Sequence, residues 1–170
     1  MSIRSVLFVV AAASCLAEAS AQDQPRPEFG LREQQPRAGS LVRRQVVGPT
    51  VIPLNLSYEQ LSPQDRARFN GNYEAVPPGD EPPFPVGGLK VILDPIGKAQ
   101  AKLSVTGNLF VIAKVDSAGI AHEVTAVGSP SPEMTQFASQ VLLLTRFKPA
   151  KCSGQPCAME FPLRMQFQVN

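Results

Sequence analysis

The clearest hydrophobic pattern in the chain is a strict alternation close to its C-terminal end. Apolar and polar side chains alternate from Met159 to Val169. A period of two places one set of side chains on a core and the other set on a wet face, so the segment predicts a β-strand. Pro162 belongs to the polar set and has no N–H. The strand is therefore expected to have an open edge on the side where that N–H would point.

Upstream of this strand the pattern predicts two helices that flank a β-hairpin. The expected elements are a helix over 89–103 that is bent or broken at Pro95, strands over 108–116 and 120–127, and a helix that follows Ser131. Ser131 and Pro132 suit the start of the second helix, and Pro149 is expected to end it. The order helix–strand–strand–helix–strand predicts an α+β domain, with an antiparallel sheet covered on one face by helices.

The second helix has one apolar face in this interpretation. Four apolar side chains recur at helical spacing: Met134, Phe137, Val141 and Leu144. We expect this face to pack on the sheet.

The first half of the chain has a different composition, because 11 of the 17 prolines fall within residues 22–88. Residues 22–45 contain few apolar side chains and predict a disordered or extended lead. Residues 46–88 predict a Pro-rich, partly extended region with one short helix at about 63–70, capped by Ser62. Its last part, residues 75–88, is expected to be a stiff connector. The compact domain is then predicted to span residues 89–170.

The first 21 residues have the pattern of a cleaved secretory signal peptide. Arg4 precedes an apolar run too short to cross a bilayer, and small residues lead to Ala21. We expect cleavage between Ala21 and Gln22. Lipoprotein processing at Cys15 is the alternative, but the large aliphatic residue usual three positions earlier is missing.

Charge and cysteine spacing narrow the function classes. The formal net charge of +2 is too small to indicate nucleic-acid binding. Signal cleavage leaves Cys152 and Cys157, and an even pair in an exported protein favours a disulfide. The four residues between them do not match a C-x-x-C redox motif or the usual zinc spacing. No segment after the signal is long and apolar enough to predict a membrane span.

Catalytic side chains are sparse. The single histidine, His122, lies in a predicted strand beside Glu123, and the chain has no G-x-S-x-G motif. We therefore predict no enzymatic activity, no cofactor and no metal site. Four cations near the last turn are interpreted as ordinary solvated side chains rather than a basic rim: Arg146, Lys148, Lys151 and Arg164.

Four motifs in this order resemble the TonB C-terminal domain family. They are G-N-L-F-V-I-A-K-V-D-S-A-G at 107–119, S-P-S-P-E-M at 129–134, R-F-K-P-A at 146–150 and M-E-F-P-L-R-M-Q-F at 159–167. The resemblance covers roughly residues 80–169, and P-P-F-P at 82–85 is similar to the segment that often precedes these domains. It implies two helices on one face of a three-stranded antiparallel sheet, in a protein of the Gram-negative periplasm.

The resemblance also implies a binding function. In this family an extended peptide of an outer-membrane receptor adds as a strand to the exposed last strand of the sheet. The matching edge here runs from Glu160 to Gln168. The expected partner-binding residues are Glu160, Phe161, Arg164, Gln166 and Gln168. We expect a periplasmic protein-binding module whose partner is a protein or peptide of the bacterial envelope, such as an outer-membrane receptor.

The chain departs from the energy transducers of this family in two ways. It is expected to have a cleavable signal where they keep a membrane anchor, and it lacks their long Lys-Pro and Glu-Pro repeats. Two alternatives stay open. The chain is an adaptor or structural envelope protein that binds through its Pro-rich N-terminal region, or it is an anchored energy transducer for outer-membrane transport. The sequence does not name the partner, any transported substrate or the oligomeric state.

Overall fold

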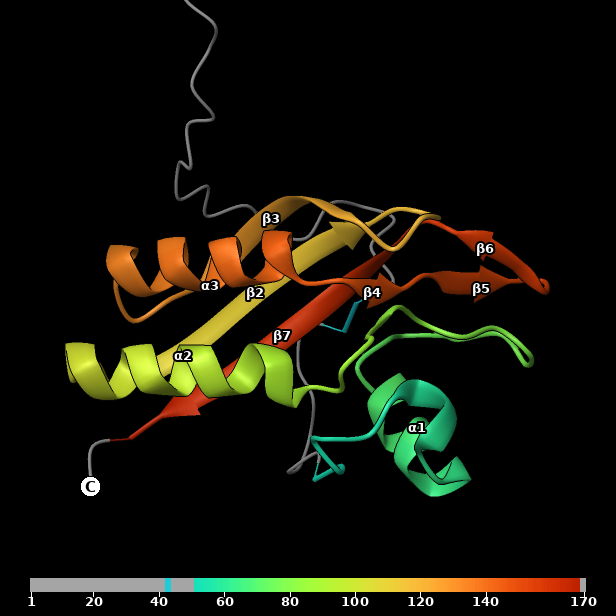
Figure 1. Ribbon diagram of the computed structural model, residues 1–170, viewed down its shortest axis with the longest axis horizontal. Coiled ribbons are helices and arrows are strands. Elements are labelled where there is room, and N and C mark those ends of the chain that lie inside the picture. Colours follow the sequence, from blue (N-terminus) through green and yellow to red (C-terminus); the bar gives the residue numbers. More distant parts are fainter. Residues whose placement is uncertain (1–41, 44–50, 169–170) are drawn as a thin grey trace, which may run out of the picture.

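The computed structural model describes residues 42–43 and 51–168 of the chain (Figure 1). The helices are η1 (Tyr58–Gln60), α1 (Pro63–Asn70), α2 (Lys90–Leu103) and α3 (Pro132–Leu144). The strands are β1 (Phe84–Pro85), β2 (Gly107–Val115), β3 (Ala121–Gly128), β4 (Phe147–Lys148), β5 (Ala150–Cys152), β6 (Gln155–Cys157) and β7 (Met159–Phe167). The expected signal peptide, its cleavage site and most of the 22–45 lead lie outside the described residues.

The centre of the fold is an antiparallel sheet with the order β3-β2-β7. Helices α2 and α3 lie side by side on one face of this sheet (Figure 1). The α+β class predicted from the order of elements and the expected three-stranded antiparallel sheet are therefore confirmed. Two small sheets, β1-β4 and β5-β6, extend the architecture beyond this prediction.

Helix α2 runs without a break through Pro95, which is its sixth residue. The proline lacks the N–H that would bond to the carbonyl of Val91, and such a loss usually kinks or breaks a helix. Here Ile92 and Ile96, four positions apart, are both fully buried. This packing holds the helix together across the proline.

Helix α3 begins as predicted and ends earlier than predicted. The Ser131 hydroxyl accepts a hydrogen bond from the Met134 N–H (3.1 Å), and Pro132 is the first helical residue. The helix stops at Leu144 because Thr145 is extended (ψ 134°), so Pro149 does not end it. The following residues form β4 instead, which pairs with β1.

The buried face of α3 also differs from the expected one. Met134, Ala138 and Leu142 are fully buried, whereas Leu144 is 86% exposed. Phe137 and Val141 are only partly buried at the margin of the contact. The small Ala138 side chain lets the helix approach its neighbours closely, so a narrow stripe with a spacing of four carries the packing.

The expected stiff connector is part of the core. Residues 80–86 run antiparallel to residues 146–153, with Phe84 opposite Lys148 and Glu81 opposite Lys151. Phe84 is fully buried. The prolines around it favour an extended backbone, which suits this pairing.

The segment before the connector packs on the same core. Helix α1 occupies the predicted residues 63–70, and the Asp65 N–H donates to the Ser62 hydroxyl (3.1 Å). The Phe69 ring lies 4.9 Å from that of Phe84 and 6.1 Å from that of Phe161 in β7. Residues on both sides of the boundary expected at residue 89 therefore share one hydrophobic core.

Two of the sequence motifs meet at the β2–β3 turn. The Asp116 carboxylate accepts the N–H groups of Ala118 and Ile120 (both 2.9 Å), which closes the turn. Gly119 has φ +77°, and its carbonyl accepts the Phe147 N–H (3.0 Å). The D-S-A-G turn and the R-F-K-P-A segment are thus bonded to each other.

Candidate functional site

Strand β7 lies at one edge of the central sheet and pairs with β2 over nine residues without a register shift. In an antiparallel strand the backbone groups of successive residues point to opposite edges. The Asp116 N–H donates to Ile120 on the β3 side, so Val115 and every second residue before it face β7. The even-numbered residues of β7 therefore direct their N–H and C=O groups away from β2.

Pro162 belongs to this outward set. Its missing N–H would have pointed to the outer edge, so no hydrogen bond to β2 is lost. The hydroxyl of Tyr73 supports this orientation independently, because it donates to the outward carbonyl of Glu160 (2.9 Å). The open edge expected beside Pro162 is thus present in the part of the chain that the structure describes.

Side chains close the outer edge at both ends. Tyr73 covers the Glu160 end and is 2% exposed, and burial raises the pKa of its hydroxyl well above the ordinary value. At the other end the Gln100 side chain donates to the Gln168 carbonyl (3.3 Å). Between them, the outward N–H and C=O groups of Arg164 and Gln166 have no partner among the described residues. We call these four groups the open edge.

The expected site residues thus divide into different environments. Arg164 and Gln166 form the open edge, and Glu160 and Gln168 stand at its two ends. Phe161 is elsewhere: it pairs with Ala113 of β2 and its side chain is 1% exposed in the core. It is therefore placed as a core residue and not as an edge contact.

The Arg164 side chain lies over the face of the sheet that points away from α2 and α3. Its guanidinium lies 3.9 Å from the centre of the Phe110 ring, its cross-strand neighbour on β2. It donates to the Asn72 side-chain oxygen (3.4 Å) and to the Arg43 carbonyl. Burial lowers the pKa of Arg164 from its usual value. These contacts fix the backbone of β7 at the open edge.

The face of the sheet away from α2 and α3 is partly buried, whereas the alternating pattern predicted that the polar side of β7 would be exposed to solvent. Ile112 is 5% exposed and Pro162 is buried. Val42, 2% exposed, pairs with Tyr73, and residues 42–43 pass behind the sheet in Figure 1. The N-terminal segment supplies this cover. The alternating pattern of β7 could not predict this cover, because the covering residues are far from β7 in sequence.

The opposite edge strand, β3, is less suited to receive a partner strand. Its ladder with β2 shifts register twice, which leaves His122 and Val127 as extra residues. Bulges of this kind twist an edge away from further pairing. His122 bonds to the Asp116 carboxylate (2.6 Å), whose pKa is lowered first by the Ile120 N–H and then by this histidine.

The cysteine pair staples the hairpin that leads into β7. Cys152 and Cys157 are disulfide-bonded, with their Cα atoms 5.8 Å apart, as predicted. The two loop residues, Ser153 and Gly154, both have positive φ, which fits the type I′ turn of a two-residue hairpin. The Asp80 carboxylate accepts the Ser153 N–H (2.7 Å), so the hairpin is also tied to the Pro-rich segment. The starting point of β7 is therefore set by a covalent link.

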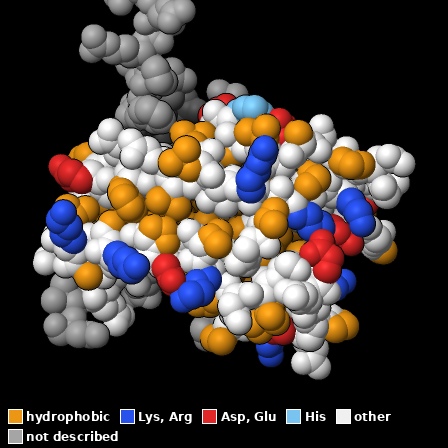
Figure 2. All heavy atoms as spheres, viewed as in Figure 1, with side chains coloured by type: hydrophobic (Ala, Val, Ile, Leu, Met, Phe, Trp, Pro, Cys, Tyr) orange, Lys and Arg blue, Asp and Glu red, His pale blue; other side chains and the backbone are white. Residues whose placement is uncertain are grey.

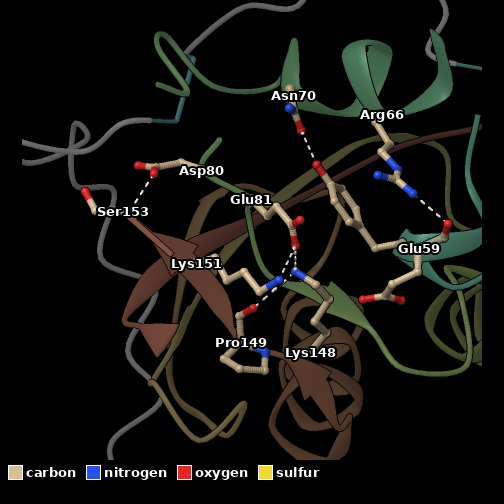
Figure 3. Close-up of polar contacts among 10 residues, drawn as sticks. Glu59, Arg66, Asn70, Asp80, Glu81, Lys148, Pro149, Lys151 and Ser153 are labelled. Carbon is tan, nitrogen blue, oxygen red and sulfur yellow. Dashed lines mark hydrogen bonds and ion pairs between the residues drawn. The ribbon is translucent and has the colours of Figure 1, made fainter. Parts of the chain in front are cut away.

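A charged cluster joins that hairpin to the N-terminal segment (Figure 3). The Glu81 carboxylate lies 2.7 Å from the Lys148 ammonium and 3.8 Å from that of Lys151. The Lys148 ammonium and the Arg66 guanidinium lie 4.7 Å and 5.3 Å from the centre of the Tyr58 ring. Lys148 is therefore a largely buried, paired side chain and not a solvated one, whereas Lys151 is exposed and lies at the margin of the cluster.

Glu81→Gln should destabilise the protein at neutral pH by about 1–2 kcal/mol, because it leaves the 15%-exposed Lys148 without a carboxylate. The Lys148 hydrogen bond lowers the pKa of Glu81. Its stabilisation is complete above the pKa of an unfolded-chain glutamate, about 4.3, and is lost as pH falls through the lower folded-state pKa. Urea unfolding of both proteins from pH 7 to pH 3 should show the difference disappear on acidification.

Asp94→Asn is the matched control, because Asp94 pairs with Lys90 on the surface (2.8 Å, side chains 45% and 58% exposed). It should change the unfolding free energy by less than about 0.5 kcal/mol at any pH. A Glu81 variant as stable as the unchanged protein at pH 7 would contradict the assignment.

The described residues contain no group of three or more His, Cys, Asp or Glu side chains arranged to hold a metal ion. Within the same residues, no helix has the length and apolar character needed to cross a bilayer. The absence of enzymatic activity and of a cofactor remains a prediction.

Comparison of the chain with protein-family models finds no matching family, and comparison with curated proteins finds no matching relative.

Proposed function

We propose that the protein binds an extended peptide of a partner protein by strand addition to the open edge of β7. The observation that carries the proposal is the pair of outward backbone positions at Arg164 and Gln166 on a strand of regular register. An added strand would bond to these groups through its own main chain. The sequence resemblance to TonB C-terminal domains favours a partner in the bacterial envelope, and the disulfide fits an oxidising compartment such as the periplasm.

The size of the open edge limits the affinity that the backbone alone can give. Arg164 and Gln166 offer two N–H and two C=O groups, and each hydrogen bond contributes about 0.5–1.5 kcal/mol net. The sum is close to the 4.1 kcal/mol of a millimolar complex. Side chains of the peptide must therefore add contacts, and those nearest the edge are Arg164 and the exposed Gln166.

Gln166→Pro should reduce partner binding about tenfold, because it removes one outward N–H donor. Pro162 shows that β7 accepts proline in the outward register, so the fold should remain intact. Binding is measured as cross-linking yield in native envelopes, from a photo-reactive residue at position 168, with the cross-linked peptide identified by mass spectrometry.

Gln166→Ala is the matched control, since it keeps the backbone N–H and should retain binding. Full retention by the proline variant would refute main-chain pairing. Loss in both variants would point to recognition of the glutamine side chain instead. Urea unfolding of each variant shows whether the fold is preserved.

The two alternatives have their own tests. A chain that lacks residues 22–41 should keep its partner under our proposal and lose it if the Pro-rich N-terminal region binds the partner through this first part. Deletions that extend into residues 51–75 are unsuitable, because Tyr58 and Phe69 belong to the core. A mature N-terminus at Gln22, measured by mass spectrometry, would exclude an anchored transducer.

A further inference from the structure

A second surface, formed by Ile120, Val86, Leu144 and Arg146, brings exposed apolar side chains around a cation. Ile120 pairs with Arg146 in an antiparallel bridge, and the Val86 N–H donates to the Arg146 carbonyl (3.0 Å). Residues directly opposite each other in antiparallel strands point to the same side. The side chains of Val86, Arg146 and Ile120 therefore form a row. Leu144 lies two residues before Arg146 in the chain. We call these four residues the Arg146 surface.

The apolar members of this surface are unusually accessible. Leu144 is 86% exposed, Val86 59% and Ile120 37%. Val91, 45% exposed, extends the surface, because its Cγ1 lies against Gly87, the residue after Val86. Figure 2 shows hydrophobic side chains gathered around the region where α3 ends. A contiguous group of exposed apolar side chains, unlike singly scattered ones, indicates an interaction site.

The charge of Arg146 is unmatched within the described residues. Its exposed side chain has no ion pair or hydrogen bond there. Two carboxylates on the paired segments are already engaged: Glu81 holds Lys148 and Lys151, and Asp116 accepts backbone N–H groups of its own turn and bonds to His122. A carboxylate brought by another molecule would therefore complement this surface.

We propose that the Arg146 surface binds an apolar segment of a partner protein that carries a carboxylate between its apolar side chains. Arginine forms two parallel hydrogen bonds with a carboxylate, and surrounding aliphatic groups exclude water and strengthen them. Arginine is enriched in protein–protein interfaces relative to the rest of the protein surface. The exposed Val86 and Ile120 side chains supply the apolar contacts on either side of the ion pair, and Leu144 adds a third.

This surface is separate from the open edge of β7. Ile120 follows the Val115 end of β2, whereas Gln166 lies opposite Asn108 at the other end of that strand. Arg164, the nearer member of the open edge, lies opposite Phe110, five residues along β2 from Val115, a distance of about 16 Å. The two proposals therefore stand independently.

The test uses two capped tripeptides as probes, acetyl-Leu-Glu-Leu-amide and acetyl-Leu-Gln-Leu-amide. Each is titrated into the isotope-labelled chain and followed by NMR. We expect the Glu peptide to shift the Arg146 Nε–H signal and the methyl signals of Val86 and Leu144. The Gln peptide should bind about tenfold more weakly, since it lacks the charge-assisted pair.

Arg146→Gln should remove the difference between the two peptides, and Leu144→Ser should weaken both. Lys98→Gln is the matched control: Lys98 is an exposed α2 cation without an ion pair among the described residues, and its loss should change nothing. Equal binding of the two peptides, or no shift at these residues, would overturn the inference. Shifts at the Arg164 and Gln166 amides alone would also overturn it, while supporting the proposed strand addition.

Discussion

Gly119→Ala is expected to lower the free energy of unfolding by about 2–4 kcal/mol. Gly119 has φ +77°, a conformation that costs an alanine about 1–2 kcal/mol. A Cβ at this position would also overlap the carbonyl oxygen of Phe147. Relief of that overlap would pull the β2–β3 turn away from β4 and weaken the hydrogen bond from the Phe147 N–H to the Gly119 carbonyl.

Gly154→Ala separates the two contributions. Gly154 has a similar φ of +83°, but a Cβ there would meet nothing within 4 Å. This control should lose only the conformational part, about 1–2 kcal/mol. Urea unfolding measured by far-UV circular dichroism gives both values. Equal losses of unfolding free energy in the two variants would show that a Cβ at position 119 does not clash with β4.

Phe84→Ala should cost about 3–5 kcal/mol, the usual loss when a buried aromatic side chain is removed. Phe84 is fully buried, and its ring lies 4.9 Å from Phe69 and 5.7 Å from Tyr58. Its removal leaves a cavity where the Pro-rich segment, α1 and β4 meet. Val86→Ala, two residues further on, should change stability by no more than about 0.5 kcal/mol because Val86 is exposed.

The tyrosines allow this experiment to test whether the fold is one unit. The chain has 2 tyrosines and no tryptophan, and both tyrosines, Tyr58 and Tyr73, precede residue 89. Tyrosine fluorescence thus reports on the N-terminal segment, while far-UV circular dichroism is dominated by the larger helices and the sheet. Coincident urea transitions are expected from a shared core. A separate early fluorescence transition would show that the N-terminal segment unfolds independently.

Local patterns were sufficient wherever the controlling contacts are close in sequence. Ser131 caps α3 and Ser62 caps α1, because a cap bonds to an N–H three residues later. Pro162 indicated the open side of β7 because proline has no N–H. It is tolerated best where that N–H would point to the outer edge and not to the neighbouring strand. Cys152 and Cys157 are five positions apart and close a short hairpin. Each of these interactions is completed within a few residues.

Contacts between distant segments explain the differences from expectation. The Pro-rich residues 80–86 look like a linker in sequence, but they find a pairing partner in residues 146–153. The family resemblance placed Phe161 among the partner-binding residues, but its ring packs against Phe69 and Phe147, on the core side that the alternation assigns to it. The α3 end, expected at Pro149, moved to Leu144 because pairing with β1 requires extended backbone at Phe147.

The sequence by itself determined the α+β class, the order of the helices and strands along residues 89–167, the disulfide and the open register of β7. These features follow from side-chain periodicity and backbone chemistry, which act over short distances. Only the tertiary structure decided which part of that edge stays accessible. Tyr73 and Gln100 close its ends, and burial of an aromatic ring against a strand 87 residues away depends on the packing of the whole core. The tertiary structure also assembled the Arg146 surface, because its members come from three separate segments.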